Sequence, residues 1–445
     1  MKPFQILSAF VYALLFSLTA NAFQAPARQD GSADAPQATR RIVNDLDRVV
    51  LPGNVHPLAT PEHRIWRTDG KLPMERIILV LKRRPGADTE MDALIAQQHD
   101  PSSPLFHHWL SPEEFEQRFG ISDDDVAAVE GWLQSYGFSI DQVTPGRGSI
   151  NFSGDADRVE RAFQTEIDEF MVDGKVYHGN STNLSIPRAL AEIVHGVFSL
   201  HDFPSHPAIG RSVAAHPKEG FANYMVNGSR GIVPGDFATI YHVRPLYSSN
   251  IDGTGQTIAI VGESNINVND VRIFRSNFGL SAKDPVVTIN GSDPGVVAVD
   301  EGEADLDVEW SGAVARNATI NLVVTASTNA TWGYVLSSQY IVSKKIASIV
   351  SLSYGQCETA EAGLSSPVSG VSRVKFFYNL WSQAVTQGMT VFVAAGDAGA
   401  AGCGRSGDKT GSGRGVLAEC STPYNVCVGG TQLNDTQNPA PLPKV

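Results

Sequence analysis

Ten residues, from Glu301 to Trp310, contain five carboxylates whose spacing could support acid–base chemistry. In a helix, residues four apart share a face, so Glu303 and Asp307 form one ridge. At about 100° per residue, Asp307, Trp310 and Val314 lie within roughly 40° of Glu303, so this ridge falls in the apolar stripe. The opposite ridge comprises Glu301, Asp305 and Glu309. Burying two ionisable groups is costly without compensation, so Glu303 and Asp307 are the candidate catalytic pair.

The opposite ridge has an ordinary interpretation, because a helix that packs on a core keeps a solvated polar face. The whole stretch also has a structural alternative. A helix start tolerates acids, since its dipole favours negative charge near the N-terminus. Under that alternative the acidic pair stabilises a helix and does no chemistry.

Two further candidate segments lie where predicted strands end. Residues 391–395 run into a Gly-Asp-Ala-Gly turn, which places Asp397 between glycines. Residues 348–353 run into Tyr354 and Gly355. In open parallel sheets the working residues collect at the carboxyl ends of the strands, which favours a functional role for both segments. The alternative for an aspartate between glycines is ordinary turn chemistry.

Hydrophobic patterning in the C-terminal half gives the elements that would position these residues. Short β-rich apolar runs alternate there with helical segments, which is typical of a parallel sheet with helices on both faces. The predicted strands are residues 257–261, 286–289, 320–324, 348–352, 390–395 and 426–429. The predicted helices are residues 268–278, 301–315, 333–343 and 371–387. The predicted fold class of this half is therefore α/β.

Residues 41–203 show a different pattern, in which strands and helices mix as in a compact antiparallel α+β domain. The predicted strands are residues 77–81, 149–152, 166–172 and 175–178, and two predicted helices are residues 89–98 and 159–163. Two more helices are expected to begin at Ser111, in a capping box with Glu114, and at Ser122. Nothing in this domain looks catalytic. Its neighbouring histidines, His99, His107 and His108, lack the i, i+4 spacing of a metal-binding helix.

The chain has 445 residues, of which 42% are hydrophobic, and this suits two or three domains with sizeable cores. A net charge of −13 and a pI near 5.3 argue against a nucleic-acid partner. Residues 1–22 resemble a secretory signal peptide, with an apolar run before an Ala-Asn-Ala site, so a secreted protein is expected, extracellular or periplasmic. No later segment reaches about 18 uninterrupted apolar residues, so no membrane span is expected after signal removal.

Composition divides the rest of the chain into segments. Residues 23–40 are predicted to be a flexible leader, residues 204–230 a linker that contains the maturation cleavage region, and residues 231–445 the parallel-sheet region. Four cysteines lie in the last quarter: Cys357, Cys403, Cys420 and Cys427. An even number favours disulfides in an exported protein, and three pairings are open. The absence of a C-x-x-C pair argues against zinc, and no metal ligand is assigned.

Taken together, these segments resemble the sedolisin or kumamolisin family of serine-carboxyl peptidases, which have a subtilisin-like fold. Residues 41–203 are similar to the family's activation prodomain, especially in Asp100-Pro-Ser-Ser-Pro-Leu-Phe-His-His-Trp-Leu-Ser-Pro-Glu-Glu-Phe115. Residues 231–445 resemble the N-terminal part of its catalytic domain. The resemblance implies a subtilisin-like parallel sheet flanked by helices, expected to be incomplete at the C-terminus, after an antiparallel α+β prodomain.

The resemblance also implies roles for the candidate residues. Glu303 and Asp307 match the family's Glu-x-x-x-Asp helix, in which the glutamate takes the proton of a serine nucleophile and the aspartate holds the glutamate. Asp397 matches the oxyanion-hole aspartate, which must be neutral to donate a hydrogen bond and therefore favours low pH. The strand end that lines the family's substrate cleft is matched by Ser353, Tyr354 and Gly355.

One part of the family pattern is not found in this sequence. The family's nucleophile lies in a Gly-Thr-Ser-x-x-x-Pro segment beyond the Asp397 region, and its calcium site lies later still. The only Gly-Gly-Thr here, at residues 429–431, is followed by Gln432. No serine has a matching context, so no nucleophile is assigned in this chain. Calcium is expected for the complete family fold, but its site is not expected within these residues.

The resemblance implies a secreted endopeptidase precursor that acts on polypeptides in acid, with its own prodomain as intramolecular inhibitor and chaperone. Three interpretations stay open: a precursor whose printed sequence is truncated, a catalytically inactive secreted protein that uses the prodomain and partial fold for binding or inhibition, and an unrelated exported α/β enzyme. A Gly-Thr-Ser-x-x-x-Pro segment encoded downstream of Val445 would support the first. Casein hydrolysis by these residues at about pH 4 would contradict the missing nucleophile.

Overall fold

The structure is a computed structural model that describes residues 42–203, 206–207, 225–226, 229–356, 372–397, 399 and 415–431. All of them belong to one compact unit, which runs from Arg40 to Val445. The predicted signal peptide, the predicted leader and most of the predicted linker lie outside the described residues. The predicted domain boundaries therefore stay predictions.

A six-stranded sheet forms the centre of the C-terminal region, and every neighbouring pair of its strands is parallel. The spatial order is β14-β15-β13-β16-β18-β19. These strands are β13 (Thr257–Gly262), β14 (Val286–Ile289), β15 (Thr319–Val324), β16 (Ile349–Leu352), β18 (Thr390–Ala394) and β19 (Val426–Val428). The sheet confirms the predicted α/β class, and each predicted strand is present with its ends shifted by at most one residue.

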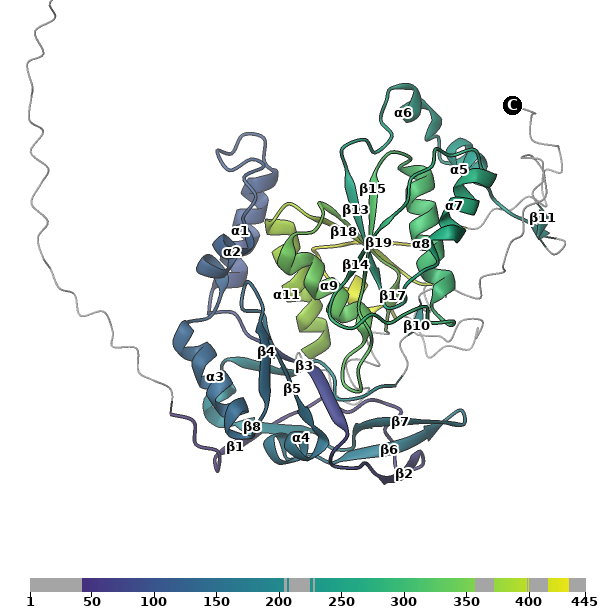
Figure 1. Ribbon diagram of the computed structural model, residues 1–445. Helices are drawn as coiled ribbons and strands as arrows, with labels where there is room; N and C mark the ends of the chain where they lie inside the picture. The colour runs from purple at the N-terminus through teal and green to yellow at the C-terminus, as the bar shows by residue number, and fades with distance from the viewer. Residues whose placement is uncertain are drawn as a thin grey trace, which may run out of the picture. The chain divides into compact units, whose positions relative to one another are not determined.

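Helices cover both faces of this sheet (Figure 1). One face carries α7 (Val268–Asn277) and α8 (Glu301–Val314), and the other carries α9 (Gly333–Lys344) and α11 (Ser372–Thr386). All four helices were predicted with nearly these bounds. The sequence analysis missed the two short helices α5 (Pro234–Ile240) and α6 (Arg244–Ser248).

Successive residues of the central strand β13 face two different hydrophobic cores. Ile260 belongs to the core that contains Val308 of α8 and Leu322 of β15. Val261, the next residue, belongs to the core that contains Leu336 of α9. A strand buried on both faces has a continuous apolar sequence, which is why these short runs predicted the sheet so closely.

The N-terminal domain is antiparallel throughout, as predicted. Its largest sheet has the order β4-β5-β3-β9, formed by β4 (Ser139–Val143), β5 (Ser149–Asp155), β3 (Pro73–Leu81) and β9 (Val194–Val197). Smaller sheets are β2 (Arg64–Arg67) with β6 (Ile167–Val172) and β7 (Lys175–Asn180), and β1 (Arg48–Leu51) with β8 (Leu184–Pro187). The helices are α1 (Ala87–His99), α2 (Pro112–Phe119), α3 (Asp123–Ser135) and α4 (Ala156–Phe163).

Both predicted helix caps of this domain are confirmed. The Ser111 hydroxyl accepts a hydrogen bond from the Glu114 backbone N–H at 3.1 Å, and Glu114 Oε2 accepts one from the Ser111 N–H at 2.7 Å. The Ser122 side chain caps α3 by accepting from the Asp125 N–H at 3.1 Å. Each cap satisfies backbone donors that the first helical turn leaves unpaired.

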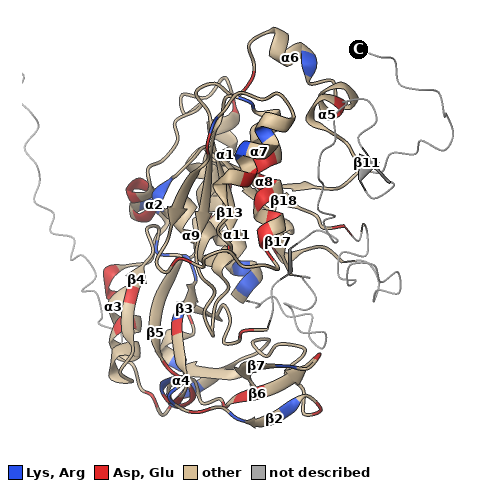
Figure 2. Cartoon of the chain, turned by 45° about the vertical axis from the view of Figure 1, so that its right-hand side comes forward, with Lys and Arg blue, Asp and Glu red and all other residues tan. Residues whose placement is uncertain are grey.

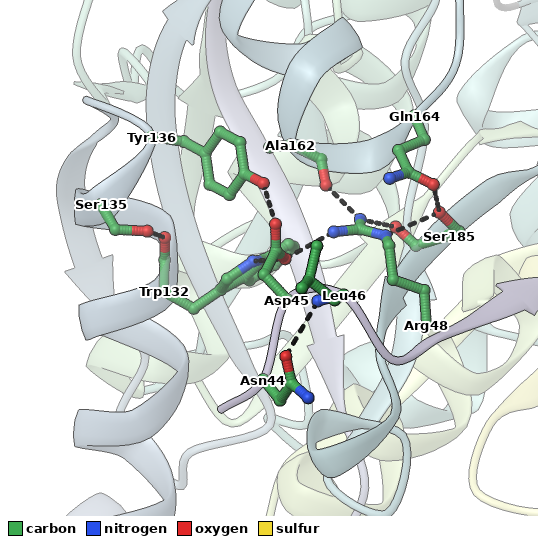
Figure 3. Close-up of polar contacts among 10 residues, drawn as sticks. All are labelled: Asn44, Asp45, Leu46, Arg48, Trp132, Ser135, Tyr136, Ala162, Gln164 and Ser185. Atoms are coloured by element: carbon green, nitrogen blue, oxygen red, sulfur yellow. Dashed lines mark hydrogen bonds and ion pairs between the residues drawn. The ribbon is translucent and has the colours of Figure 1, made fainter. Parts of the chain in front are cut away.

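A polar cluster around Asp45 fixes the start of the described chain against α3 (Figure 3). Trp132 Nε1 donates to Asp45 Oδ1 at 3.2 Å, the Tyr136 hydroxyl donates to Asp45 Oδ2, and Arg48 Nη1 donates to Asp45 Oδ1 at 2.5 Å. The partners lie up to 91 residues apart in sequence. No local pattern predicts such a cluster, and the sequence analysis missed it.

The large sheet of the N-terminal domain packs against α9 and α11 through polar and apolar contacts. Asn151 Nδ2 donates to Gln339 Oε1 at 2.5 Å, and Arg83 Nη2 donates to Ser382 Oγ at 2.6 Å. Apolar side chains of the domain, Ile78, Val80 and Phe198, join the core shared by α9 and α11. The two regions therefore form one continuous packed structure.

Two histidines of the N-terminal domain are enclosed beside a cation of α11. The His201 ring is 1% exposed, lies 4.5 Å from the His56 ring and accepts a hydrogen bond at Nε2 from the Arg373 guanidinium. The aromatic rings of Phe203 and Trp332 complete the enclosure of His201. Burial and then the charge of Arg373 lower the pKa of His56 to about 3, and the same two causes lower the pKa of His201. Both rings are therefore neutral in mildly acidic solution.

Replacing His201 by Phe is expected to reduce the loss of stability in acid. An unfolded histidine binds a proton near pH 6.5, whereas folded His201 does so only at lower pH, so its contribution to the free energy of unfolding falls as the pH falls below that value. Urea midpoints between about pH 7 and about pH 4.5 measure the effect, because the decline in the H201F variant should be shallower than in the wild type.

His178 provides a control of opposite sign. Its Nδ1 lies 2.8 Å from Asp202 Oδ2, and this hydrogen bond raises the pKa of His178, so the folded ring binds its proton at higher pH than the unfolded one. That stabilisation is present in acid and is lost as the pH rises through the folded pKa. The urea midpoint of the H178F variant should therefore fall more steeply with falling pH than that of the wild type. Equal slopes for the wild type and H201F would contradict the histidine account.

Candidate active site

The loop before α8 is tied to the carboxyl end of β13, and this fixes the first turn of the helix beside the sheet edge. Ser264, two residues after β13, accepts a hydrogen bond at Oγ from the Val297 N–H at 2.9 Å. Asn265 N–H donates to the Gly295 carbonyl at 2.8 Å. These contacts place the start of α8 at the edge of the sheet where functional residues of parallel sheets collect.

Glu303 and Asp307 of α8 are both withdrawn from water, as predicted. Glu303 is 3% exposed, and Asp307 is half-buried. Burial, followed by the negative charge of Asp307, raises the pKa of Glu303, and burial raises the pKa of Asp307. Among the described residues, neither Glu303 Oε2 nor Asp307 Oδ2 has a hydrogen-bond partner. Two such buried oxygens can receive hydrogen bonds from a reacting group.

The direction of the apolar stripe on α8 was predicted wrongly. Its buried positions besides Glu303 are Ala304, Val308, Gly312 and Ala313, whereas Trp310 and Val314 are only half-buried. At about 100° per residue, Ala304 and Val308 lie roughly 100–140° from Glu303. The acidic pair therefore lies at the border of the buried face, beside the strand ends. The sheet and α7 both pack against α8, so a single-stripe helical wheel does not describe it.

The second acidic ridge of α8, Glu301, Asp305 and Glu309, is half-buried and thus more enclosed than predicted. Figure 2 shows the acidic residues of α8 in red. Burial, followed by the charges of Asp270 and Glu301, raises the pKa of Asp305 to about 6. Burial, followed by the charges of Asp305 and Asp270, raises the pKa of Glu309 to about 8. Asp270 belongs to α7. The face of α8 that was expected to be solvated is therefore a half-buried group of acids between α7 and α8.

Asp397 follows β18, within electrostatic reach of the pair. It comes directly after Gly396, whose φ of 79° suits glycine, and its side chain is exposed. After burial and the charge of Asp307, the negative charge of Asp397 contributes to the raised pKa of Glu303. The structure thus brings a strand end and a helix that are 90 positions apart in the sequence to one site.

The third predicted segment, residues 353–355, lies at the end of β16 and has two different surroundings. The Ser353 hydroxyl donates to Asp307 Oδ1 at 2.9 Å. Tyr354 is 1% exposed and stacks on Tyr334 with a ring-centroid distance of 5.6 Å. Its buried hydroxyl has no hydrogen-bond partner among the described residues, and burial raises its pKa.

The backbone of the same segment is paired with the predicted linker. Tyr354 and Gly355 form β17, which pairs antiparallel with β10 (His206–Pro207) in the register Pro207 to Tyr354 and His206 to Gly355. A strand edge that could bind an extended peptide is therefore occupied by the chain itself.

Three buried acids near this edge were not predicted as site residues. Glu263, just after β13, accepts from Ser327 Oγ at 3.2 Å. Glu419 accepts from the Tyr334 hydroxyl at 2.8 Å, and burial raises its pKa to about 7. Burial also raises the pKa of Asp300, the residue before α8. Only Glu263 had a usable signal, its position directly after a predicted strand. Glu419 acquires its environment from contacts across the fold.

Comparison with known proteins agrees with this geometry. Residues 66–203 match the Pro-kumamolisin activation domain. Sedolisin from Pseudomonas sp. (strain 101) is 28% identical over 372 residues, which cover 81% of this chain and 60% of sedolisin. Kumamolisin from Bacillus sp. (strain MN-32) is 26% identical, covering 80% of this chain and 62% of kumamolisin. Xanthomonalisin from Xanthomonas sp. (strain T-22) is 27% identical, and the aligned residues cover 81% of this chain and 46% of xanthomonalisin.

These similarities support the assignment of this chain to the sedolisin family. The chain spans between 46% and 62% of the length of these three relatives. A solved structure, Pseudomonas sedolisin complexed with two molecules of pseudo-iodotyrostatin, aligns at 25% identity over 45% of this chain and 54% of that chain, with a TM-score of 0.38.

The sedolisin-family resemblance implies calcium, but the described residues do not provide a convincing site for it. Asp270, Glu301 and Asp305 are the only group of metal-capable side chains found among them, with oxygens within 4.8 Å of one another. Calcium takes roughly six to eight oxygen ligands, and acidic clusters of this kind are common without an ion. Three carboxylates alone fit calcium poorly, so no role is assigned to a metal.

Of the four cysteines, two are described in this chain. Cys420 and Cys427 form a disulfide with a Cα–Cα distance of 5.2 Å, which resolves the pairing that the sequence left open for them. It joins a short 3-10 turn to β19. Cys357 and Cys403 lie outside the described residues.

Replacing Asp307 by Asn is expected to lower the pKa of Glu303, because it removes a neighbouring negative charge while Glu303 stays buried. Carboxyl ¹³C NMR on protein labelled at glutamate would measure the titration, with the Glu303→Gln variant identifying the signal. Asp305→Asn is the matched control, since Asp305 lies on the other ridge and does not contribute to the shift of Glu303. An unchanged or higher Glu303 pKa in D307N would contradict the electrostatic coupling.

Proposed function

We propose that this chain is the secreted precursor of a serine-carboxyl endopeptidase that acts in acid. The observation that carries the proposal is the pair of carboxylates on one side of α8 whose second oxygens are buried without partners among the described residues. Glu303 acts as the general base, Asp307 holds it, and Asp397 donates to the oxyanion when protonated. The substrates are polypeptides.

The raised pKa values of the pair set a condition on this chemistry. A base must be ionised to accept a proton, and burial opposes ionisation of Glu303 and Asp307. A donor hydroxyl placed against Glu303 Oε2 favours its ionised form. The serine hydroxyl of the family mechanism would be such a donor. No serine of this chain is assigned that role, in keeping with the missing sequence motif.

Pairing of β10 with β17 supports an inhibitory role for the N-terminal domain and its linker. Protein substrates commonly bind peptidases as an added strand, and residues 206–207 already pair with the edge at residues 354–355. The match of residues 66–203 to an activation domain agrees with this role. The N-terminal domain thus acts as an intramolecular inhibitor, and by the same contacts as a folding template for α9 and α11.

Export is the remaining part of the proposal. It rests on the signal-peptide pattern of residues 1–22 and on the class of the relatives. Among the described residues, none of the helices has the length and apolar character needed to cross a membrane.

The decisive experiment is a casein-hydrolysis assay of the protein expressed from its own gene, over about pH 3 to 7, with wild type and the Glu303→Gln variant. Loss of a positioned general base is expected to lower kcat/KM by roughly 10²- to 10⁴-fold. Asp307→Asn should lower it less, because the base remains. Glu301→Gln is the matched control, since it makes the same change on the other ridge of α8 and should leave activity within about twofold.

Two outcomes would contradict the proposal. Hydrolysis that survives Glu303→Gln would show that the base lies elsewhere. A folded wild-type protein that hydrolyses nothing at any of these pH values, yet binds casein, would favour the alternative of an inactive binding or inhibitory protein.

A further inference from the structure

Ser353 connects the central sheet to the acidic pair. It follows directly after Leu352, the last residue of β16, and β16 is hydrogen-bonded to β13 on one side and to β18 on the other. Its side chain is buried, and its Oγ donates to Asp307 Oδ1 at 2.9 Å. Because both neighbouring strands hold β16, the hydroxyl is presented to Asp307 from a rigid position.

The Ser353 hydroxyl hydrogen-bonds Asp307 and also lowers the pKa of Glu303. Asp307 has a hydroxyl donor at Oδ1, while its Oδ2 and Glu303 Oε2 have no partner among the described residues. A hydrogen bond from a neutral donor stabilises a carboxylate more than a carboxylic acid, and buried anions depend on such donors. Asp307, held by a fixed donor, is therefore the better site for a negative charge.

The charges around the pair make this donor important. Burial and the charges of Asp307, Asp397 and Asp300 all disfavour ionisation of Glu303. The Ser353 hydroxyl is the group that acts in the opposite direction on both members of the pair. Without it, the pair would remain uncharged over a wider range of pH and would be a poorer proton acceptor.

We propose that Ser353 is a positioning residue whose hydroxyl keeps Asp307 ionised, so that Asp307 retains its charge while the Glu303 carboxylate takes up and releases the proton. This inference rests on the proposed function. In the acyl-transfer step, the attacking hydroxyl gives its proton to Glu303 while its oxygen bonds to the carbonyl carbon and the carbonyl π electrons move to the carbonyl oxygen. Asp307 stays anionic and takes no proton.

Ser353→Ala tests the proposal without any need for hydrolysis. Carboxyl ¹³C NMR of the full chain, labelled at aspartate and glutamate, should show the Asp307 signal titrating at a pH higher by about one unit, the size expected for one hydrogen bond to a charged group. Ser353→Thr keeps the hydroxyl and should titrate near the wild type. Ser351→Ala makes the same change two residues earlier on β16 and should leave both signals unchanged.

If the protein hydrolyses casein, enzyme kinetics of the same variants provide a second test of the role of Ser353. The acid limb of the kcat profile should move to higher pH in Ser353→Ala, while KM changes less than twofold, because the hydroxyl donates to Asp307. Wild-type titration of Asp307 in a folded Ser353→Ala protein would overturn the inference, and so would an equal shift in Ser353→Thr. A confirmed NMR shift in a protein that hydrolyses nothing would instead leave the positioning role standing and count against the peptidase function.

Discussion

Withdrawal of two carboxylates from water on α8 is the constraint on which the rest of the site depends. Glu303 and Asp307 lose hydration and repel each other, so their ionised forms persist only with help from the surroundings. The surroundings come from three strand ends. The loop after β13 anchors the helix through Ser264, and β16 supplies the Ser353 hydroxyl. The third strand, β18, brings Asp397, whose negative charge opposes ionisation of Glu303.

A parallel sheet makes this arrangement possible, because adjacent strands deliver their carboxyl ends to one edge although the residues are far apart in sequence. The helix contributes the complementary requirement, two carboxylates one turn apart on the side that faces the edge. Neither the helix nor the strand ends alone would place a buried acid beside other functional groups. A turn such as the one at Asp397 is solvated, and the second ridge of α8 is enclosed by α7 without contact to any strand end that is described.

Acid has opposite effects on the buried acids and the enclosed histidines of the molecule. Buried acids with raised pKa values ionise less readily in the folded state than in the unfolded state, so they destabilise the fold at neutral pH. For Glu419, with its pKa near 7, this cost is roughly 3 kcal/mol at pH 7 and disappears below its unfolded pKa. The enclosed histidines of the N-terminal domain behave in the reverse manner, because His56 and His201 resist the proton that the unfolded chain accepts. Acidification therefore removes the cost at Glu419 and adds one at His56 and His201.

The sequence predicted the parts of this structure that follow from local patterns. Strands buried on both faces have continuous apolar runs, so the sheet was placed within one residue. The i, i+4 spacing divided the five acids of α8 into two ridges, and the choice of Glu303 and Asp307 as the catalytic pair stays a prediction. The direction of the buried face of α8 was predicted wrongly because α5 and α7 pack on that helix in addition to the sheet strands β13 and β15. The Asp45 cluster and the contact of His201 with Arg373 were missed for a different reason. They join residues 87 to 172 positions apart, and no local pattern records such neighbours.

The N-terminal domain contacts α9 and α11 through groups of different kinds. Their chemistry identifies which of them can make the stability of this interface depend on pH. Apolar side chains such as Ile78 and Val80 supply affinity at roughly 25 cal/mol per Å² buried, and this contribution does not depend on pH. The hydrogen bond between the amides of Asn151 and Gln339 contributes about 1 kcal/mol net. Both groups hydrogen-bond water when the domain separates, so this contact orients the domain but adds little to the free energy of separation. Neither kind of contact titrates between pH 7 and pH 4. Any acid-dependent loosening of this interface must therefore come from its ionisable groups, and the enclosed histidines beside Arg373 are among the members whose protonation opposes the contact.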